Sequence, residues 1–177
     1  HNEDELNELL SLINNEKKIL KTTVPITVKI SPDIQDENIN IISDLLLKHN
    51  VEAVIISNTT DKNRENLSNI NKLEKGGLSG KPLEKRSNEL INKFYKILKK
   101  KIKIIGVGGV DSGQSAYQKI INGASLVQLY TGMIYQGPSI VSKISQELIN
   151  ILDKEGVKNI SDAVGSKNWS WLATLEH

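Results

Sequence analysis

Cysteine is absent from this sequence of 177 residues. Without thiols there is no disulfide framework, no thiolate nucleophile and no zinc site with cysteine ligands. Long apolar runs are missing too, because none approaches the roughly 18 residues that a membrane-spanning helix requires. The opening "HNEDELNELL" is acidic, unlike a signal or transit peptide. We therefore expect a chain that neither crosses a membrane nor carries a targeting segment.

The sequence also lacks an excess of charge of one sign. It has 23 basic and 21 acidic residues, for a net charge of +2, spread along the whole length. Nucleic-acid binders carry a basic stripe, which is missing here, so no nucleic-acid partner is expected. The densest positive run, "KILKKKIKI" at 96–104, is typical of a solvated helix end that leads into a strand. A composition of 38% hydrophobic and 25% charged residues indicates one globular domain.

Both ends of the sequence are unusual as natural termini. There is no initiator methionine, and the first residues begin within a helical pattern. The closing "LEH" is typical of the remnant of a histidine tag. We expect residues 1–165 to form the domain and residues 166–177 to be a tail that is partly vector-derived.

Short runs rich in β-branched residues alternate with helical patterns along the chain. Buried strands are predicted at 24–30, 53–57, 102–108 and 125–130. Helices are predicted at 36–50, 87–100, 112–123 and 139–156, with left-handed caps at Asn50, Gly123 and Gly156. This alternation predicts βαβ units and a parallel sheet.

The glycine positions discriminate between two architectures for such a sheet. An open dinucleotide-binding sheet has G-x-G-x-x-G after its first strand, but the first strand here ends in "KISPD". Glycines crowd instead into "GVGGVDSG" (106–113) after the third strand and "YTG" (130–132) after the fourth. Phosphate sites after the last two strands are typical of (β/α)₈ barrels. We therefore expect an α/β fold, the last four βα units of a (β/α)₈ TIM barrel, with about half of the barrel absent.

Polar residues at the ends of the first two strands are candidate ligand contacts. Lys29 lies near the end of the run "VPITVKI", and a lysine buried in a barrel needs a polar partner such as a ligand at the barrel mouth. Alternatively, it lies one residue past the strand with its ammonium in solvent. The small polar residues "SNTT" (57–60) end the second strand, where barrel enzymes contact substrate. Their alternative is an ordinary turn or helix cap.

Glycine-bearing turns are candidate anion sites. "GVGGVDSG" offers backbone N–H groups just before an expected N-cap at Ser112, and "QLYTG" repeats the arrangement one strand later. Backbone amides and a helix dipole suit a phosphate, so the pair favours a phosphate-bearing cofactor, although a tight strand-to-helix turn also uses Gly-Gly. "KLEKGGLSGKPLEKR" (72–86) indicates either close approach of the backbone to a ligand or a flexible hairpin.

Taken in order, "VKISPD", "ISNTT", "KGGLSGKPL", "IIGVGGVDSG" and "GASLVQLYTGMIYQGP" resemble the C-terminal half of dihydroorotate dehydrogenase, from about residue 5 to about residue 165. "SNTT" and "QLYTGMIYQGP" favour class 2, the membrane-associated, quinone-reducing members. The resemblance implies oxidation of dihydroorotate to orotate in pyrimidine biosynthesis. It also implies an FMN across the mouth of a (β/α)₈ barrel, with orotate stacked on it.

The resemblance assigns roles to individual residues, and no metal ligand is among them. It implies that Lys29 contacts the flavin ring near N1 and the C2 carbonyl, where a positive charge stabilises the reduced anionic flavin. The other FMN contacts would be Ser57 and, at the phosphate, Gly80, Gly109, Tyr130 and Thr131. Asn58 and Thr59 would hydrogen-bond the pyrimidine. The glycine-rich loop would then close against the flavin, where side chains would collide with it.

The sequence also departs from the family. Class 2 members take a proton from dihydroorotate with a serine in a motif resembling N-x-S-S-P-N-T, and no such motif occurs here. We therefore expect no catalytic residue in this chain, a base serine in the missing N-terminal half, and no turnover by the 177 residues alone.

The resemblance further implies the partners and location of the full-length protein. Dihydroorotate or orotate, a quinone and the missing N-terminal half of the barrel are the expected partners. The membrane-docking N-terminal extension of class 2 is absent from this sequence. A peripheral location follows for the full-length protein, on the cytoplasmic face of the bacterial inner membrane or on the mitochondrial inner membrane.

Two other functions remain open at this stage. One is a non-catalytic half-barrel that self-associates and so buries the open sheet edges. The other is a phosphate-binding barrel of the isomerase or aldolase type, with Lys29 as a base or Schiff-base amine.

Overall fold

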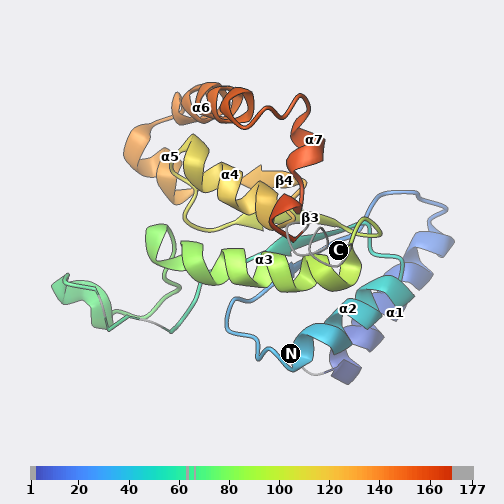
Figure 1. Cartoon of the computed structure of the whole chain (residues 1–177). Coiled ribbons are helices and arrows are strands. Elements are labelled where there is room, and N and C mark those ends of the chain that lie inside the picture. The colour runs from blue at the N-terminus through green and yellow to red at the C-terminus, as the bar shows by residue number, and fades with distance from the viewer. Residues whose placement is uncertain (1–2, 63, 66, 169–177) are drawn as a thin grey trace, which may run out of the picture.

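A four-stranded parallel sheet organises the chain (Figure 1). The computed structural model describes residues 3–62, 64–65 and 67–168. The strands are β1 (Thr27–Ile30), β2 (Ala53–Ile56), β3 (Lys103–Val107) and β4 (Leu126–Gln128), and they lie in the sheet in chain order. Every pair is parallel. A sheet that grows in one direction without reversing its strand order is typical of a barrel, and the prediction of a partial (β/α)₈ barrel is confirmed.

Helices connect the strands in the predicted alternation. The connecting helices are α2 (Asn38–Lys48), α3 (Glu84–Leu98) and α4 (Gly113–Asn122). The flanking helices are α1 (Glu3–Ile19), α5 (Thr131–Gln136), α6 (Ile140–Lys154) and α7 (Ile160–Ala163), and the 3₁₀ turns are η1 (Ile70–Leu73), η2 (Lys81–Leu83) and η3 (Ser166–Asn168). The sequence analysis did not predict the short helix α5. The segment between β2 and α3 projects away from the sheet (Figure 1).

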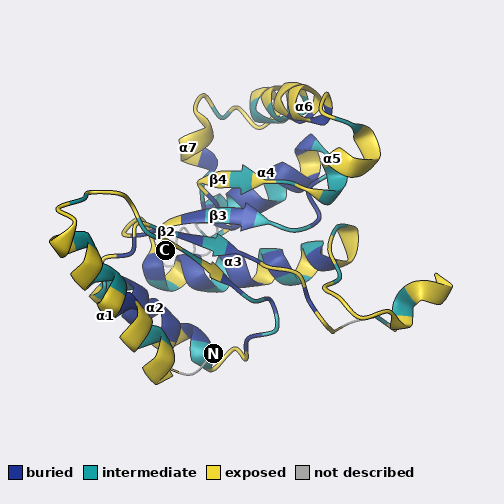
Figure 2. Ribbon diagram, turned by 180° about the vertical axis from the view of Figure 1, so that it is seen from behind, coloured by how far each residue is buried: buried dark blue, intermediate teal, exposed yellow. Residues whose placement is uncertain are grey.

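The hydrophobic core lies between the helices and one face of the sheet, as the buried colouring in Figure 2 shows. Alternation along the strands turns Val54, Ile56 and Ile104 toward the helices. The helical period of α3 supplies the opposing surface, and its fully buried apolar residues are Leu90, Ile91, Phe94 and Leu98. Burial of this set stabilises the sheet and fixes which strand residues point the other way.

The opposite face of the sheet is only partly covered by this chain. Lys29, Ile55, Ile105 and Leu126 share one register line across the strands. Lys29 and Leu126 are exposed, and the isoleucines between them are half-buried. In the described part of the chain, the outer edges of β1 and β4 pair with no further strand. Over the described residues, this is the geometry of a partial barrel whose interior face and two outer edges are open.

Several local predictions can be compared with the structure. Asn50, Gly123 and Gly156 have φ of 53°, 128° and 68°, so the predicted left-handed caps are confirmed. Ser112 caps α4 in a capping box with Ser115. The first strand was predicted too long, because only Thr27–Ile30 is in the sheet. Most of the predicted tail, including "WSWLATLEH", lies outside the described residues.

Candidate functional site

The predicted phosphate residues gather around one cavity at the carboxyl edge of the sheet. Gly80, Gly109, Tyr130 and Thr131 line a cavity of about 200 Å³. They come from the glycine-rich loop before α3, the turn after β3 and the junction of β4 with α5. Parallel strands place these ends together, so segments far apart in sequence form one wall. A larger hollow of about 700 Å³ lies in the segment at 61–76, and none of the predicted site residues lines it.

At the turn after β3, neighbouring protein atoms leave no room for a side chain, so glycine is required. Gly108 and Gly109 have φ of 109° and 76°, a conformation that residues with a side chain rarely adopt. A Cβ on Gly109 would lie 2.4 Å from the Cβ of Glu84, at the start of α3. The turn therefore runs against α3, and this contact would exclude a side chain even without a ligand.

The glycine-rich loop also packs on protein. A Cβ on Gly77 would lie 1.9 Å from Thr59 Oγ1, and one on Gly80 would lie 3.0 Å from Thr131 Cγ2. The hydroxyl oxygens of Ser79 and Thr131 are 2.9 Å apart, within hydrogen-bond distance. The sequence analysis expected a flavin as the reason for these glycines. The structure adds a second reason, which is close approach to the ends of two other segments.

A two-residue antiparallel bridge closes the projecting segment between β2 and α3. The Thr60 N–H donates to the Leu78 carbonyl at 3.1 Å, and the Leu78 N–H donates back at 2.7 Å. Asp33, in the loop after β1, accepts from the Thr60 hydroxyl at 2.5 Å and from the Asp61 N–H at 3.0 Å. Asp33 thus joins the end of β1 to the end of β2, a role that the sequence analysis missed.

The predicted pyrimidine contacts follow β2 directly. Ser57 is buried, and its N–H donates to the Val107 carbonyl at 3.2 Å. The Asn58 N–H donates to the Ile30 carbonyl at 2.8 Å. The backbone of this segment is therefore held between β1 and β3, while the side chains of Asn58 and Thr59 are exposed. Within this segment only Asn58 and Thr59 are exposed, because Ser57 and Thr60 are buried.

Lys29 lies apart from the glycine-lined cavity. It is inside β1, one residue before the strand ends, so the alternative is wrong in placing it past the strand but right in leaving its side chain exposed. Its side chain is exposed in this chain, on the partly covered face of the sheet, and pairs with no acidic residue of the described ranges. The predicted site therefore has a phosphate end at β3 and β4 and a separate end at β1 and β2.

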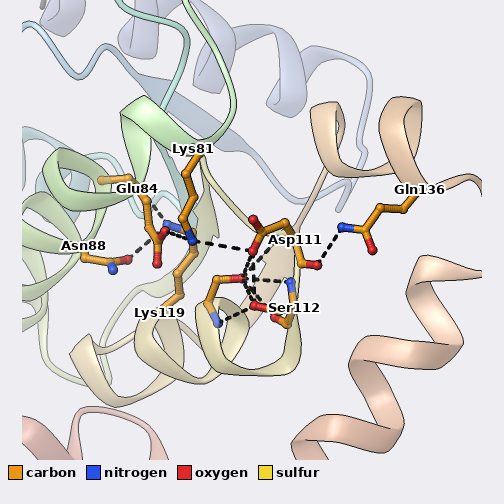
Figure 3. A network of polar contacts seen from close by, with 9 residues as sticks. Lys81, Glu84, Asn88, Asp111, Ser112, Lys119 and Gln136 are labelled. Atoms are coloured by element: carbon orange, nitrogen blue, oxygen red, sulfur yellow. Dashed lines mark hydrogen bonds and ion pairs between the residues drawn. The ribbon is translucent and has the colours of Figure 1, made fainter. Parts of the chain in front are cut away.

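A charged network, drawn in Figure 3, adjoins the cavity, because Lys81, Asp111 and Gln136 belong to both. The Lys81 ammonium lies 2.7 Å from a Glu84 carboxylate oxygen and 3.6 Å from one of Asp111. The hydrogen bond that the Lys81 ammonium donates to Glu84 is the main cause of the raised pKa of Lys81. The Gln136 amide donates to the Asp111 backbone carbonyl at 3.0 Å, which ties α5 to the turn after β3. Lys81 lines the cavity and supplies a cation there.

A second lysine of this region is fully buried. Lys119 of α4 has 0% exposure, and its ammonium donates to Ser87 Oγ at 3.1 Å and Asn88 Oδ1 at 3.0 Å. Burial lowers its pKa to about 8, with Glu84 acting in the opposite direction. The sequence analysis missed it, because nothing in "AYQKII" distinguishes a buried lysine from a solvated one.

Over the residues that the structure describes, no helix combines the length and apolarity needed to cross a bilayer.

This chain is similar to known dihydroorotate dehydrogenases. A family model described as dihydroorotate dehydrogenase matches residues 1–152. A dihydroorotate dehydrogenase (quinone) of Trichodesmium erythraeum is 44% identical in an alignment that covers 94% of this chain and 45% of that protein. A mitochondrial dihydroorotate dehydrogenase (quinone) of Arabidopsis thaliana is 43% identical over 143 residues, 80% of this chain and 31% of that protein.

Solved structures agree with the sequence relatives. The crystal structure of DHODH from Eimeria tenella in complex with ferulenol superposes with a TM-score of 0.89 at 34% identity, covering 94% of this chain and 49% of that one. The chain thus spans less than half of the relatives described here.

Proposed function

This chain belongs to the dihydroorotate dehydrogenase family, and we propose that it is the C-terminal half of a quinone-dependent, FMN-containing member. In the complete protein the activity would be oxidation of dihydroorotate to orotate, with a quinone as electron acceptor. The observation that carries this proposal is the cavity lined by Gly80, Gly109, Tyr130 and Thr131. The chemistry of that cavity is suited to the phosphate of FMN.

The donors around the cavity fit a phosphate group. Within the described ranges, no hydrogen bond occupies the N–H groups of Gly109 and Thr131. The Thr131 hydroxyl and the Lys81 ammonium add a neutral donor and a cation. Backbone N–H groups, a hydroxyl and a lysine are the donors that bind phosphate in proteins. We therefore assign the phosphate to these residues.

The other end of the site would hold the flavin ring and the pyrimidine. Bound FMN would accept the hydride that dihydroorotate loses. Lys29 would place its positive charge near the ring, and Ser57 would contact it from the end of β2. The exposed side chains of Asn58 and Thr59 would donate to and accept from the pyrimidine, on a backbone that Ile30 and Val107 hold in place.

This half supplies no base in the proposal. The base serine, the remaining strands and the quinone site would come from the N-terminal half, and membrane contact would come from an extension before it. The location proposed for the full-length protein is peripheral, at the bacterial inner membrane or the mitochondrial inner membrane. The missing strands would cover Ile55, Ile105 and Leu126 and pair with the open edges of β1 and β4.

The same open face favours a second candidate, self-association of the half-barrel. An uncovered face that includes the exposed Leu126 and two unpaired edges is a surface on which a second copy could pair. Family membership argues for the N-terminal half as the natural partner. The isomerase or aldolase alternative has no such support.

The test compares this chain alone with the chain joined to, or co-expressed with, the N-terminal half of the barrel. The joined protein should purify yellow, release FMN on denaturation and form orotate with a quinone or dye acceptor. Thr131→Val keeps the shape and removes one donor, so it should lower FMN content per protein after desalting. Thr23→Val, at an exposed position of the loop before β1, should not. A colourless joined protein, or unchanged FMN content in Thr131→Val, would contradict the assignment.

A further inference from the structure

Lys119 is a buried titratable group outside the site assigned above. Its side chain runs beneath β3, where a Cβ on Gly106 would lie 2.9 Å from Lys119 Cδ. Fully buried lysines are rare because the ammonium loses its hydration. A lysine at such a position needs hydrogen-bond acceptors that replace the lost water. The acceptors are Ser87 and Asn88 of α3, and Figure 3 shows Lys119 pointing toward Asn88.

Ser87 carries the effect of Lys119 to the edge of the sheet. The Ser87 hydroxyl accepts from Lys119 at 3.1 Å, donates to the Val107 carbonyl at 2.5 Å and lies 3.3 Å from the Ile56 carbonyl. Val107 and Ile56 are the last residues of β3 and β2. The next residues along the chain are Gly108 and Ser57, so the hydroxyl stands directly behind both proposed flavin-contacting segments.

We propose that Lys119 is a positioning residue of the phosphate site, which holds the ends of β2 and β3 through Ser87 and places a buried positive charge behind the glycine turn. The inference rests on the proposed FMN site and deepens it. Lys119 would touch no flavin atom. It would fix the carbonyl of Val107, and with it the path of Gly108 and Gly109, in the conformation that directs backbone N–H groups at the anion.

The charges that act on Lys119 are few. Glu84 favours its protonated form and Lys81 opposes it, while Asp111 faces Lys81. From α6, Glu147 accepts from the Gly113 N–H at the first turn of α4. Burial brings the pKa of Lys119 to about 8, and a phosphate dianion bound nearby would favour the protonated form. Phosphate binding would therefore take up a proton in mildly alkaline solution.

The experiment measures affinity for FMN and for riboflavin, which lacks the phosphate, in the chain joined to its N-terminal half. The pH runs from about 7 to 9.5, where a phosphate with a second pKa near 6 stays dianionic. The variants are Lys119→Met, which removes the charge at similar length, and Ser87→Ala, which removes only the relay. Lys96→Met, at an exposed position of α3, is the matched control.

In the wild type, FMN affinity should fall as pH rises above about 8, and riboflavin affinity should stay level. Lys119→Met should weaken FMN by about tenfold near pH 7, the size of one charge-assisted hydrogen bond, and should lose the pH dependence. Ser87→Ala should also weaken FMN more than riboflavin, and it provides the test if Lys119→Met does not fold. Lys96→Met should match the wild type.

The possible failures are distinct. If the wild type binds riboflavin as tightly as FMN, the phosphate site itself is wrong. If the wild type prefers FMN but both variants keep that preference and the wild-type pH profile, the phosphate site stands and the positioning role of Lys119 is wrong.

Discussion

Lys119 should make the stability of the flavin-free protein rise with pH. The pKa of Lys119 is lowered from 10.5 to about 8 in the folded protein, mainly by burial. Between these values the unfolded chain binds a proton that the folded chain has lost, so raising the pH favours the folded state. Below pH 8 Lys119 is protonated in both the folded and the unfolded state, so burial of its charge lowers the stability of the folded protein by the full amount. The shift corresponds to roughly 3 kcal/mol, because each pKa unit is worth about 1.4 kcal/mol.

The assay is urea unfolding of the chain joined to its N-terminal half, without flavin, at pH values from about 7 to 10. Other groups titrate in this range, so the informative quantity is the difference between wild type and Lys119→Met. Between about pH 7 and pH 10, the free energy of unfolding of the wild type should rise by about 2–3 kcal/mol more than that of the variant. Parallel curves for the two proteins would refute the reasoning, and Lys96→Met should follow the wild type.

The remaining predictions concern the site and the completeness of the chain. Lys29→Ala should make flavin reduction less favourable by about 1–3 kcal/mol, the range of a charge-assisted hydrogen bond, and a redox titration that shows an unchanged or higher potential would contradict the role of Lys29. Gly109→Ala should lower the thermal midpoint with or without FMN, because the new Cβ would lie 2.4 Å from that of Glu84; destabilisation only in the presence of FMN would argue against this contact. The isolated chain should form no measurable orotate, since loss of a general base alone costs about 10²- to 10⁴-fold, and clear turnover in a host without its own enzyme would show that a base is present.

Local patterns carried most of the fold prediction. Short runs rich in β-branched residues located the strands, and apolar residues recurring at three and four located the longer helices. Residues that favour helix caps located the caps at Asn50, Gly123 and Ser112. Helix α5 was not predicted, because Thr131–Gln136 is too short to show a helical period. The correct predictions share a cause, because each depended on residues close in sequence.

Contacts between residues distant in sequence could not be predicted from such local patterns. The sequence indicated that "GGLSG" admits close approach, but the approaching atoms include Thr59 and Thr131, which are distant along the chain. The burial of Lys119 depends on the space beneath Gly106 and on acceptors from another helix. The gathering of Gly80, Gly109 and Thr131 followed from family resemblance, and their shared cavity is visible only once the chain is folded.

The bridge between Thr60 and Leu78 has an evolutionary consequence. Since its hydrogen bonds fasten both ends of the intervening segment, the length and composition of the part at 62–76 are uncoupled from the positions of Asn58 and Gly80 on either side. The entropic cost of closing a longer loop grows only with the logarithm of its length. Insertions, deletions or an appended recognition element could therefore accumulate between the two fastened ends, and this part of the molecule is free to diversify among lineages while the chemistry beside it stays constant.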